Sequence, residues 1–315
     1  MNFTDSPFEQ MMKEVPRPGR GSSGPCAGCR YAKECKNQKG RCRKKFRALL
    51  VEPQASGQRG PKLTVREIPK EQAIGFIRRY HYSKIMPRLN KHYLGFYTGN
   101  RLAGVVALGW GTQPLQSIRK MFPRHRLQSG DYLEIGKMCF LPEMNGNQCF
   151  GSRVLSQLVK WLKNNTDCLF LYTLADGIMG KCGYVYQAAN FRYIGSFPTS
   201  VYRCTATGEK IHPRSARLLL EENAALDGVE RRFWLTHGYC EYKGIEKING
   251  LMFRYLYPLN RQAKKILNAY PEYRGLPNPK DKDLKFTMRT APGVYAPIPP
   301  PLFNRDVCQF NTQKC

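Results

Sequence analysis

The chain has 315 residues, of which 51 are lysine or arginine and 23 are aspartate or glutamate, so its formal net charge is +28 at pH 7. Such an excess of positive charge favours polyanionic partners, with nucleic acid first and an anionic membrane surface second. No apolar run approaches the ~20 residues that span a bilayer, and the N-terminal residues lack the apolar core of a signal peptide. We therefore expect a soluble, cytoplasmic protein that has no membrane partner.

The N-terminal region contains a cluster of four cysteines. Residues 1–25 are rich in Pro, Gly and Ser and are expected to be flexible. In residues 26–48, the first two cysteines have the CxxC spacing of a tetrahedral zinc site. The second pair is more widely spaced, so an iron–sulfur cluster is the alternative metal centre. Four reduced thiols that bind no metal are the non-functional alternative. The predicted ligands are Cys26, Cys29, Cys35 and Cys42. Neighbouring basic residues, Lys44 and Lys45 among them, would bind phosphate.

Residues 60–260 are expected to form the main domain, and 261–315 a basic, Pro-rich extension that is loop-like from Asn268 onward. Alternation and helical spacing of apolar residues predict its elements. In chain order these are a strand at 62–68, a helix at 69–83, a hairpin of strands 93–97 and 102–108, a strand in 130–144, a long helix in 147–166, a strand at 168–176, a helix at 181–191, a strand at 192–197, a helix at 214–226 and two short strands in 239–259.

This order predicts an α+β fold with a mixed central sheet and flanking helices. It is similar to the order in the GCN5-related N-acetyltransferase (GNAT) fold. In that fold the two strands that flank the long helix splay apart, and an acyl donor lies between them. The start of the long helix faces the donor's phosphates, as expected for an anion at a helix N-terminus.

Four stretches together resemble the Mom family of phage DNA modification proteins, which are GNAT-like. They are "RRYHYSK" (78–84), "YLEIGKM" (132–138), "GSRVLS" (151–156) and "YTLADGIMGKCGYVYQAANFRYIG" (172–195). The resemblance covers about residues 60–260. It implies carbamoylmethylation of adenine N6 in double-stranded DNA, which protects phage DNA from restriction, in the host-cell cytoplasm if a phage encodes this chain. The functional positions that it implies are His81, Tyr82, Lys137, Ser152, Arg153, Asp176 and Tyr186.

The predicted catalytic residues can also be interpreted chemically. Asp176 follows a buried strand, where a carboxylate can accept a proton from an amine, although Asp-Gly is also a common turn. Tyr186 is a candidate proton donor to a leaving group, or a core aromatic. His81, beside Tyr82, is a candidate base or, as the resemblance implies, a ligand of active-site iron; a structural histidine is the alternative.

The predicted cofactor residues are Gly151, Ser152, Arg153 and Lys137. The first three occupy the pyrophosphate-loop position of a GNAT fold, but Arg153 stands where that loop has a small residue, which argues against acetyl-CoA as the donor. Lys137 stands where relatives often have Arg, and Lys lacks the bidentate fork. The donor stays unknown, with CoA-borne and RNA-borne carriers both open.

Basic loops and aromatic side chains are expected to contact DNA. Candidate phosphate contacts are Arg124, Arg126 and Arg214, with ordinary surface charge as the alternative. Aromatic candidates for holding an extracted base are Tyr82, Trp110, Tyr184 and Tyr186. Glycines after Asp176 are expected to let the backbone approach a substrate. Two other functions remain open, a GNAT acyltransferase acting on a small-molecule or protein amine, and a non-enzymatic nucleic-acid-binding protein.

Overall fold

The computed structural model describes residues 62–111, 113–144, 149–211, 216–304 and 307. The chain divides into two compact units, Met1–Gly60 and Pro61–Cys315, and every described residue belongs to the second. Several predicted site residues lie outside the described residues, so their roles stay predictions. They are the cysteines Cys26, Cys29, Cys35 and Cys42 and the basic residues Lys44, Lys45 and Arg214.

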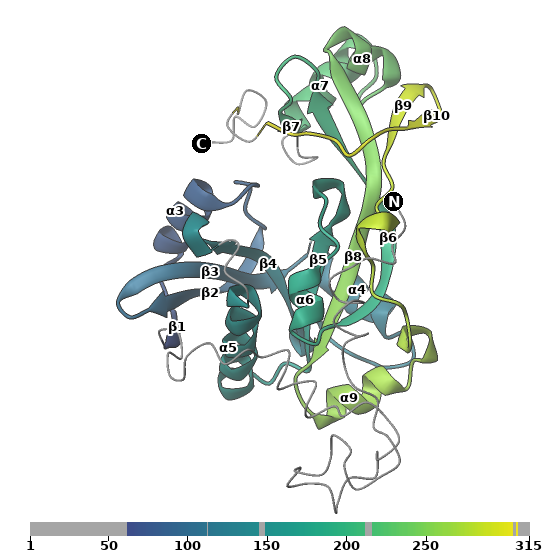
Figure 1. Cartoon of the computed structure of the whole chain (residues 1–315). Coiled ribbons are helices and arrows are strands. Elements are labelled where there is room, and N and C mark those ends of the chain that lie inside the picture. Colours follow the sequence, from purple (N-terminus) through teal and green to yellow (C-terminus); the bar gives the residue numbers. More distant parts are fainter. Residues whose placement is uncertain (1–61, 112, 145–148, 212–215, 305–306, 308–315) are drawn as a thin grey trace, which may run out of the picture. The chain divides into compact units, whose positions relative to one another are not determined.

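A ten-stranded mixed sheet organises the described unit (Figure 1). Its strands follow the order β1-β2-β3-β4-β5-β8-β6-β7, and β9 joins β8 and carries β10. Strands β4 and β5 pair in parallel, whereas the other described strand pairs are antiparallel. The strands are β1 Leu63–Glu67, β2 Leu89–Thr98, β3 Arg101–Trp110, β4 Tyr132–Phe140, β5 Phe170–Asp176, β6 Arg192–Cys204, β7 Lys210–Ile211, β8 Ile245–Pro258, β9 Thr287–Ala291 and β10 Val294–Pro297.

Seven α-helices are described in this unit, and the predicted α+β class with a mixed central sheet is confirmed. Figure 1 shows α7 and α8 at one end of the long strand β8 and α9 at its other end. A short helix, α4, was not predicted from the sequence. The helices are α3 Lys70–Tyr80, α4 Pro114–Met121, α5 Phe150–Asn165, α6 Tyr184–Ala188, α7 Arg217–Leu226, α8 His237–Tyr242 and α9 Arg261–Asn268.

The region 239–259 differs from its prediction. Instead of two short strands it contains the end of α8 and one 14-residue strand, β8. Gly250 lies inside this strand, where a Cβ atom would come within 2.6 Å of the Ile178 side chain. The glycine therefore makes room for a packed neighbour and does not end the strand.

The C-terminal extension also contains more regular structure than expected. The hairpin of β9 and β10 turns at Gly293, whose φ is +75°. Strand β9 adds to β8 through the pairs Ile248–Met288 and Asn249–Thr287. The prediction that the chain is loop-like from Asn268 onward is therefore wrong for this hairpin. Its prolines lie at the strand edge and in the turn, where they do not prevent the backbone hydrogen bonds between two short strands.

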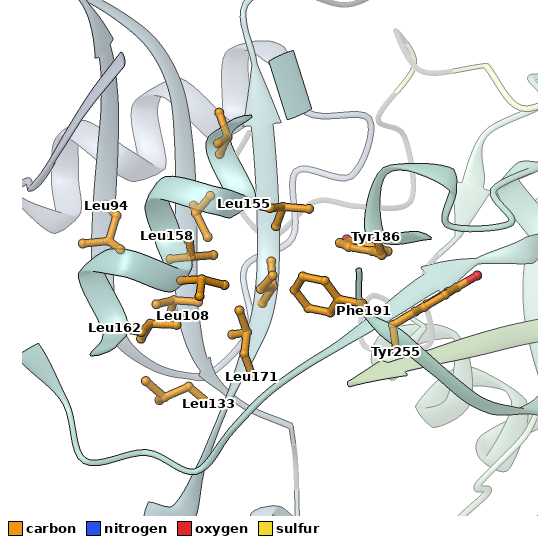
Figure 2. Packing of buried hydrophobic residues seen from close by; sticks show 14 of the residues in the cluster. Leu94, Leu108, Leu133, Leu155, Leu158, Leu162, Leu171, Tyr186, Phe191 and Tyr255 are labelled. Atoms are coloured by element: carbon orange, nitrogen blue, oxygen red, sulfur yellow. The ribbon is translucent and has the colours of Figure 1, made fainter. Parts of the chain in front are cut away.

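The main hydrophobic core lies between the sheet and helices α5 and α6 (Figure 2). Val154, Leu155, Leu158 and Leu162 recur at helical spacing along α5 and are fully buried. They pack on alternate residues of the strands, Leu133 and Leu171 among them. The apolar stripe that predicted this helix is therefore the face that holds it on the sheet.

The other face of the sheet is covered by α3, α4 and α9. Ala73 and Ile77 of α3 pack against β3 and β4. Helices α4 and α9 share a second cluster with Tyr132 and Phe170, the first residues of β4 and β5. Because successive strand residues point to opposite faces, helices on both faces bury the central strands.

Strands β4 and β5 diverge along their length, as expected for the two strands that flank the long helix. They pair from Tyr132–Phe170 to Ile135–Thr173 and no further. Beyond that point β4 stays with β3, and β5 stays with β8. The remaining residues, 136–140 of β4 and 174–176 of β5, thus form the two arms of a fork.

Candidate active site

A pocket of about 300 Å³ opens between the arms of this fork. Its wall comes from four segments: the chain after α3, the arm of β4, the arm of β5, and the loop that leads into α6. The predicted residues His81, Tyr82, Lys137, Asp176 and Tyr186 all line it. Residues from distant parts of the sequence therefore meet at the carboxyl ends of two parallel strands, where ligands bind in open α/β sheets.

Asp176 forms an ion pair at the pocket wall. Lys210 Nζ of β7 lies 2.8 Å from Asp176 Oδ2, and the two side chains are 17% and 14% exposed. Although Asp176 precedes the 3₁₀ turn Gly177–Met179, its side chain makes no capping hydrogen bond there. The carboxylate is thus oriented by a charge-assisted hydrogen bond and does not serve as a turn cap.

Tyr82 is surrounded by charged and aromatic groups. The His81 ring stacks on it with centroids 4.3 Å apart. Lys181 Nζ lies 3.8 Å from the Tyr82 ring centroid, and Lys210 Nζ lies 6.0 Å from it. Ammonium groups at these distances from a tyrosine ring are attracted by its π electrons. Lys181 lines the pocket, and Lys210 contacts two of its lining residues, Asp176 and Tyr82. Neither lysine was predicted from the sequence as part of the site.

Lys137 links the β4 arm to the chain that follows α3. Its Nζ donates to Ser83 O and to Ser83 Oγ, both at 3.0 Å. Gly136 next to it allows Pro87 to pack closely, because a Cβ at Gly136 would lie 2.7 Å from Pro87 Cγ. Lys137 therefore fixes the segment that carries His81 and Tyr82, and brings its charge to the pocket wall.

Tyr186 is nearly buried, and burial raises the pKa of its phenol. Its ring lies against those of Phe191 and Tyr255, at centroid distances of 5.6 and 5.5 Å (Figure 2). The hydroxyl is therefore protonated at neutral pH, and the raised pKa makes it a weaker acid than an exposed phenol. The aromatic-core interpretation and the pocket interpretation of Tyr186 both apply, because the residue belongs to the core and lines the pocket.

Cys182 also lines the pocket, but it is a poor nucleophile. Burial and, to a lesser extent, a hydrogen bond with Asp281 together raise the pKa of its thiol to about 11. The thiolate is the reactive form of cysteine. A covalent intermediate on Cys182 is therefore disfavoured at neutral pH.

Two of the three loop glycines serve packing within the protein. A Cβ at Gly177 would lie 2.4 Å from the Leu251 carbonyl oxygen, and one at Gly183 would lie 2.4 Å from the Tyr255 ring. Gly180 differs, because its φ is +71° and the space beside it is open. The expectation that these glycines let the backbone approach a substrate thus fits Gly180, whereas the other two let the loop approach β8.

The predicted cofactor residues at the start of α5 do not line the pocket. A Cβ at Gly151 would lie 2.5 Å from Val185 Cγ2, so the glycine permits α5 and α6 to pack closely. Ser152 Oγ donates to Cys149 O at 2.9 Å, within the first turn of the helix. Arg153 lies in that same turn, half-buried.

The predicted DNA contacts Arg124 and Arg126 lie before β4, away from the fork. Arg124 donates to Ala269 O at 3.0 Å, lies 4.2 Å from the centroid of the Tyr270 ring and pairs with Glu272 at 3.4 Å. Arg126 is exposed. Trp110 does not line the pocket either. Its Nε1 donates to the backbone oxygens of Ser129 and Tyr132, near the start of β4. Tyr184, by contrast, lines the pocket.

The described residues do not supply a metal site. No three His, Cys, Asp or Glu side chains converge among them. His81, Asp176 and Cys182 all line the pocket, but among the described residues they do not come together as a group that could hold a metal ion, so they do not fit the iron that the family resemblance implies. No helix in the described part of the chain is long and apolar enough to cross a membrane.

Comparisons with known proteins identify the relatives of this chain. The sequence model of the Mom protein family matches residues 62–280. The methylcarbamoylase Mom of Escherichia phage Mu is 28% identical over 235 residues, which cover 74% of this chain and 91% of that protein.

Acetyltransferases are among the solved structures to which this chain is similar. The IAA acetyltransferase from Bacillus cereus ATCC 14579 is 16% identical with a TM-score of 0.32, covering 43% of this chain and 80% of that chain. The ribosomal-protein-S18-alanine N-acetyltransferase from Escherichia coli is 8% identical with a TM-score of 0.33, covering 63% and 95%. TM-scores this low decide nothing about the site.

Proposed function

The chain belongs to the Mom protein family, and we propose that it transfers a small acyl or glycine-derived group to a base amine in DNA. The observation that carries the proposal is the position of Asp176, a paired carboxylate at the wall of the β4–β5 pocket. The relative from phage Mu is a methylcarbamoylase, which favours a carbamoylmethyl group on adenine N6. Such a modification would protect phage DNA from restriction.

In the proposed reaction the base amine attacks a carbon of the donor. A nitrogen–carbon bond forms, the bond from that carbon to the leaving group breaks, and the amine proton passes to Asp176. Tyr186 gives its phenolic proton to the leaving group, and the cycle closes when the proton on Asp176 passes through solvent to Tyr186. Lys210 holds the carboxylate in place through the 2.8 Å contact.

The charges of the pocket wall favour an anionic donor. Among the described residues, Lys137 and Lys181 line the pocket and Lys210 contacts its wall, whereas Asp176 lines it and Asp281 contacts its wall. A phosphate or carboxylate on the donor would be attracted to this excess of ammonium groups. CoA-borne and RNA-borne donors both satisfy this requirement. Gly151 packs closely on Val185, so it serves the contact between α5 and α6. This packing, like the bulky Arg153, argues against a pyrophosphate-binding loop of the usual GNAT kind at the start of α5.

The proposed DNA partner follows from the charge and from the aromatic wall. A net charge of +28 favours phosphate binding. An enzyme that reacts with a base in duplex DNA extracts it and holds it against aromatic groups. Tyr82, Tyr184 and Tyr186 line the pocket, and we propose that they hold the extracted base.

The test is the nucleoside composition of DNA from bacteria that express the protein. We expect a new nucleoside, whose mass identifies the transferred group, and its loss in Asp176→Asn. Asp167→Asn is the matched control, because Asp167 is an exposed carboxylate just before β5. A nucleoside profile equal to that of cells with an empty vector, under confirmed expression of folded protein, would overturn the proposal and favour transfer to a small-molecule or protein amine.

A further inference from the structure

The segment that follows the family match returns to the candidate site. The match ends at residue 280. Directly after it, the Asp281 backbone N–H donates to the Tyr184 hydroxyl at 3.2 Å, and Asp281 Oδ1 lies 3.5 Å from Cys182 Sγ. Because Cys182 and Tyr184 both line the pocket, the extension contacts its wall where the family match stops.

A second contact lies farther along, beside β7. Asn304 N donates to Gly208 O at 2.8 Å, and Asn304 forms an isolated parallel β-bridge with Glu209. Arg203 Nη1 donates to Leu302 O at 3.2 Å. These backbone contacts hold residues 302–304 alongside the turn that leads into Lys210.

Phe303 is the side chain that this contact brings to the ion pair. Lys210 Nζ lies 5.7 Å from the centroid of its half-buried ring. The ring also packs against a buried cluster that contains Ile178, which belongs to the turn directly after Asp176. Phe303 therefore lies beside the Lys210 ammonium and packs against the same cluster as the turn that follows Asp176.

We propose that Phe303 is a positioning residue for the Lys210–Asp176 ion pair, so that the C-terminal extension is part of the active site; this inference rests on the proposed function. A lysine side chain has many rotamers, and holding it in one of them is costly in entropy. An aromatic ring beside the ammonium restricts these rotamers and excludes water from the ion pair. The carboxylate is then held toward the pocket before a substrate arrives.

The chemical reactivity of Lys210 tests the positioning without requiring transfer activity. Reductive methylation of the full-length protein, followed by peptide mass spectrometry, gives the rate at each lysine. We expect Phe303→Ala to raise the rate at Lys210 by about threefold or more, because the cation–ring contact and water exclusion are lost. Lys160, exposed on α5, serves as an internal reference whose rate is unchanged.

Companion variants separate positioning from a general effect on folding. Phe303→Tyr keeps the ring and should retain the wild-type rate at Lys210. Phe303→Leu keeps apolar volume without a ring, and it replaces Phe303→Ala if that variant fails to fold. Leu302→Ala is the matched control, because Leu302 is 84% exposed.

The same variants are then compared in the nucleoside assay. Phe303→Ala is expected to lower the yield of the modified nucleoside per folded protein by about tenfold, since small displacements of catalytic groups are costly. An unchanged methylation rate at Lys210 in folded Phe303→Ala or Phe303→Leu would overturn the inference. If the wild-type protein produces no modified nucleoside, the proposed function is contradicted instead. The methylation rates at Lys210 would still show whether Phe303 positions this side chain.

Discussion

Strands β4 and β5 begin in one kind of environment and end in another. Their first residues pair, and the rings of Phe122 and Phe170 stack there at 4.6 Å in a buried aromatic cluster. Their last residues are unpaired with each other and line a pocket that contains the Lys210–Asp176 ion pair. The same pair of strands thus supplies a rigid base and, where their pairing stops, room for a substrate.

Two cations make the difference concrete. Arg124, near the start of β4, has a side chain that is 57% exposed and pairs with Glu272 at 3.4 Å. Lys210, at the other end, has a side chain that is 17% exposed and pairs with Asp176 at 2.8 Å. Exposed ion pairs contribute little, about 0–1 kcal/mol, whereas a half-buried pair holds its carboxylate in one orientation. A positive charge alone therefore does not identify a functional residue. The position of the charged side chain relative to the fork of β4 and β5 is the feature that separates Lys210 from Arg124.

The largest expected effect is that of Asp176→Asn. Loss of the proton acceptor should lower the yield of modified nucleoside by about 10²–10⁴-fold. The melting temperature should also fall, because the half-buried Lys210 ammonium loses this carboxylate, so the yield is expressed per folded protein. A variant that retains wild-type yield would show that Asp176 is not the base.

At the opposite end, Phe122→Ala should affect stability and spare the chemistry. Phe122 is fully buried between α4, β5 and α9. Truncation of a buried phenylalanine costs about 3–5 kcal/mol of unfolding free energy, measurable by urea denaturation. The yield per folded protein should stay at the wild-type level, and a fall comparable to that of Asp176→Asn would break the distinction between the two ends.

Glycine substitutions in the loop after Asp176 sharpen the comparison within the fork. Gly177→Ala places a Cβ 2.4 Å from the backbone oxygen of Leu251, and such overpacking costs about 1–3 kcal/mol. Gly180→Ala meets open space but has a φ of +71°, which costs about 1–2 kcal/mol. Chemical denaturation should rank Gly177→Ala as the more destabilised, and the reverse order would contradict the packing role of Gly177.

Alkaline pH should loosen the paired end of the strands. Burial raises the pKa of Tyr132 to about 12, above the value of about 10 in an unfolded chain. A raised pKa means that this contribution to stability is fully present below pH 10 and is lost as the pH rises through 12. The unfolding free energy of Tyr132→Phe should therefore fall less steeply between pH 9 and 11 than that of wild type, and equal slopes would exclude this contribution.

Much of the fold and part of the site could be predicted from the sequence. The apolar periodicity of the elements is a local signal, and His81 and Asp176 stand at the ends of such elements, whereas Tyr186 lies inside the short helix α6. The family resemblance singled out these three positions. The pairing of Lys210 with Asp176 could not be predicted from the sequence. The two residues are 34 positions apart, and their contact depends on the order of the strands in the sheet. The packing role of Gly250 was out of reach for a similar reason, since the neighbour that explains it, Ile178, comes from a distant turn.

The most direct test of the account compares Lys210→Met with Arg124→Met in the same cells. The two substitutions remove one ammonium or guanidinium charge at opposite ends of the strands and keep a long apolar side chain. The account predicts that Lys210→Met lowers the modified nucleoside per folded protein by about tenfold or more, because a half-buried carboxylate loses this partner, whereas Arg124→Met stays within about twofold of wild type. Equal losses in both variants, or a loss in Arg124→Met alone, would contradict it.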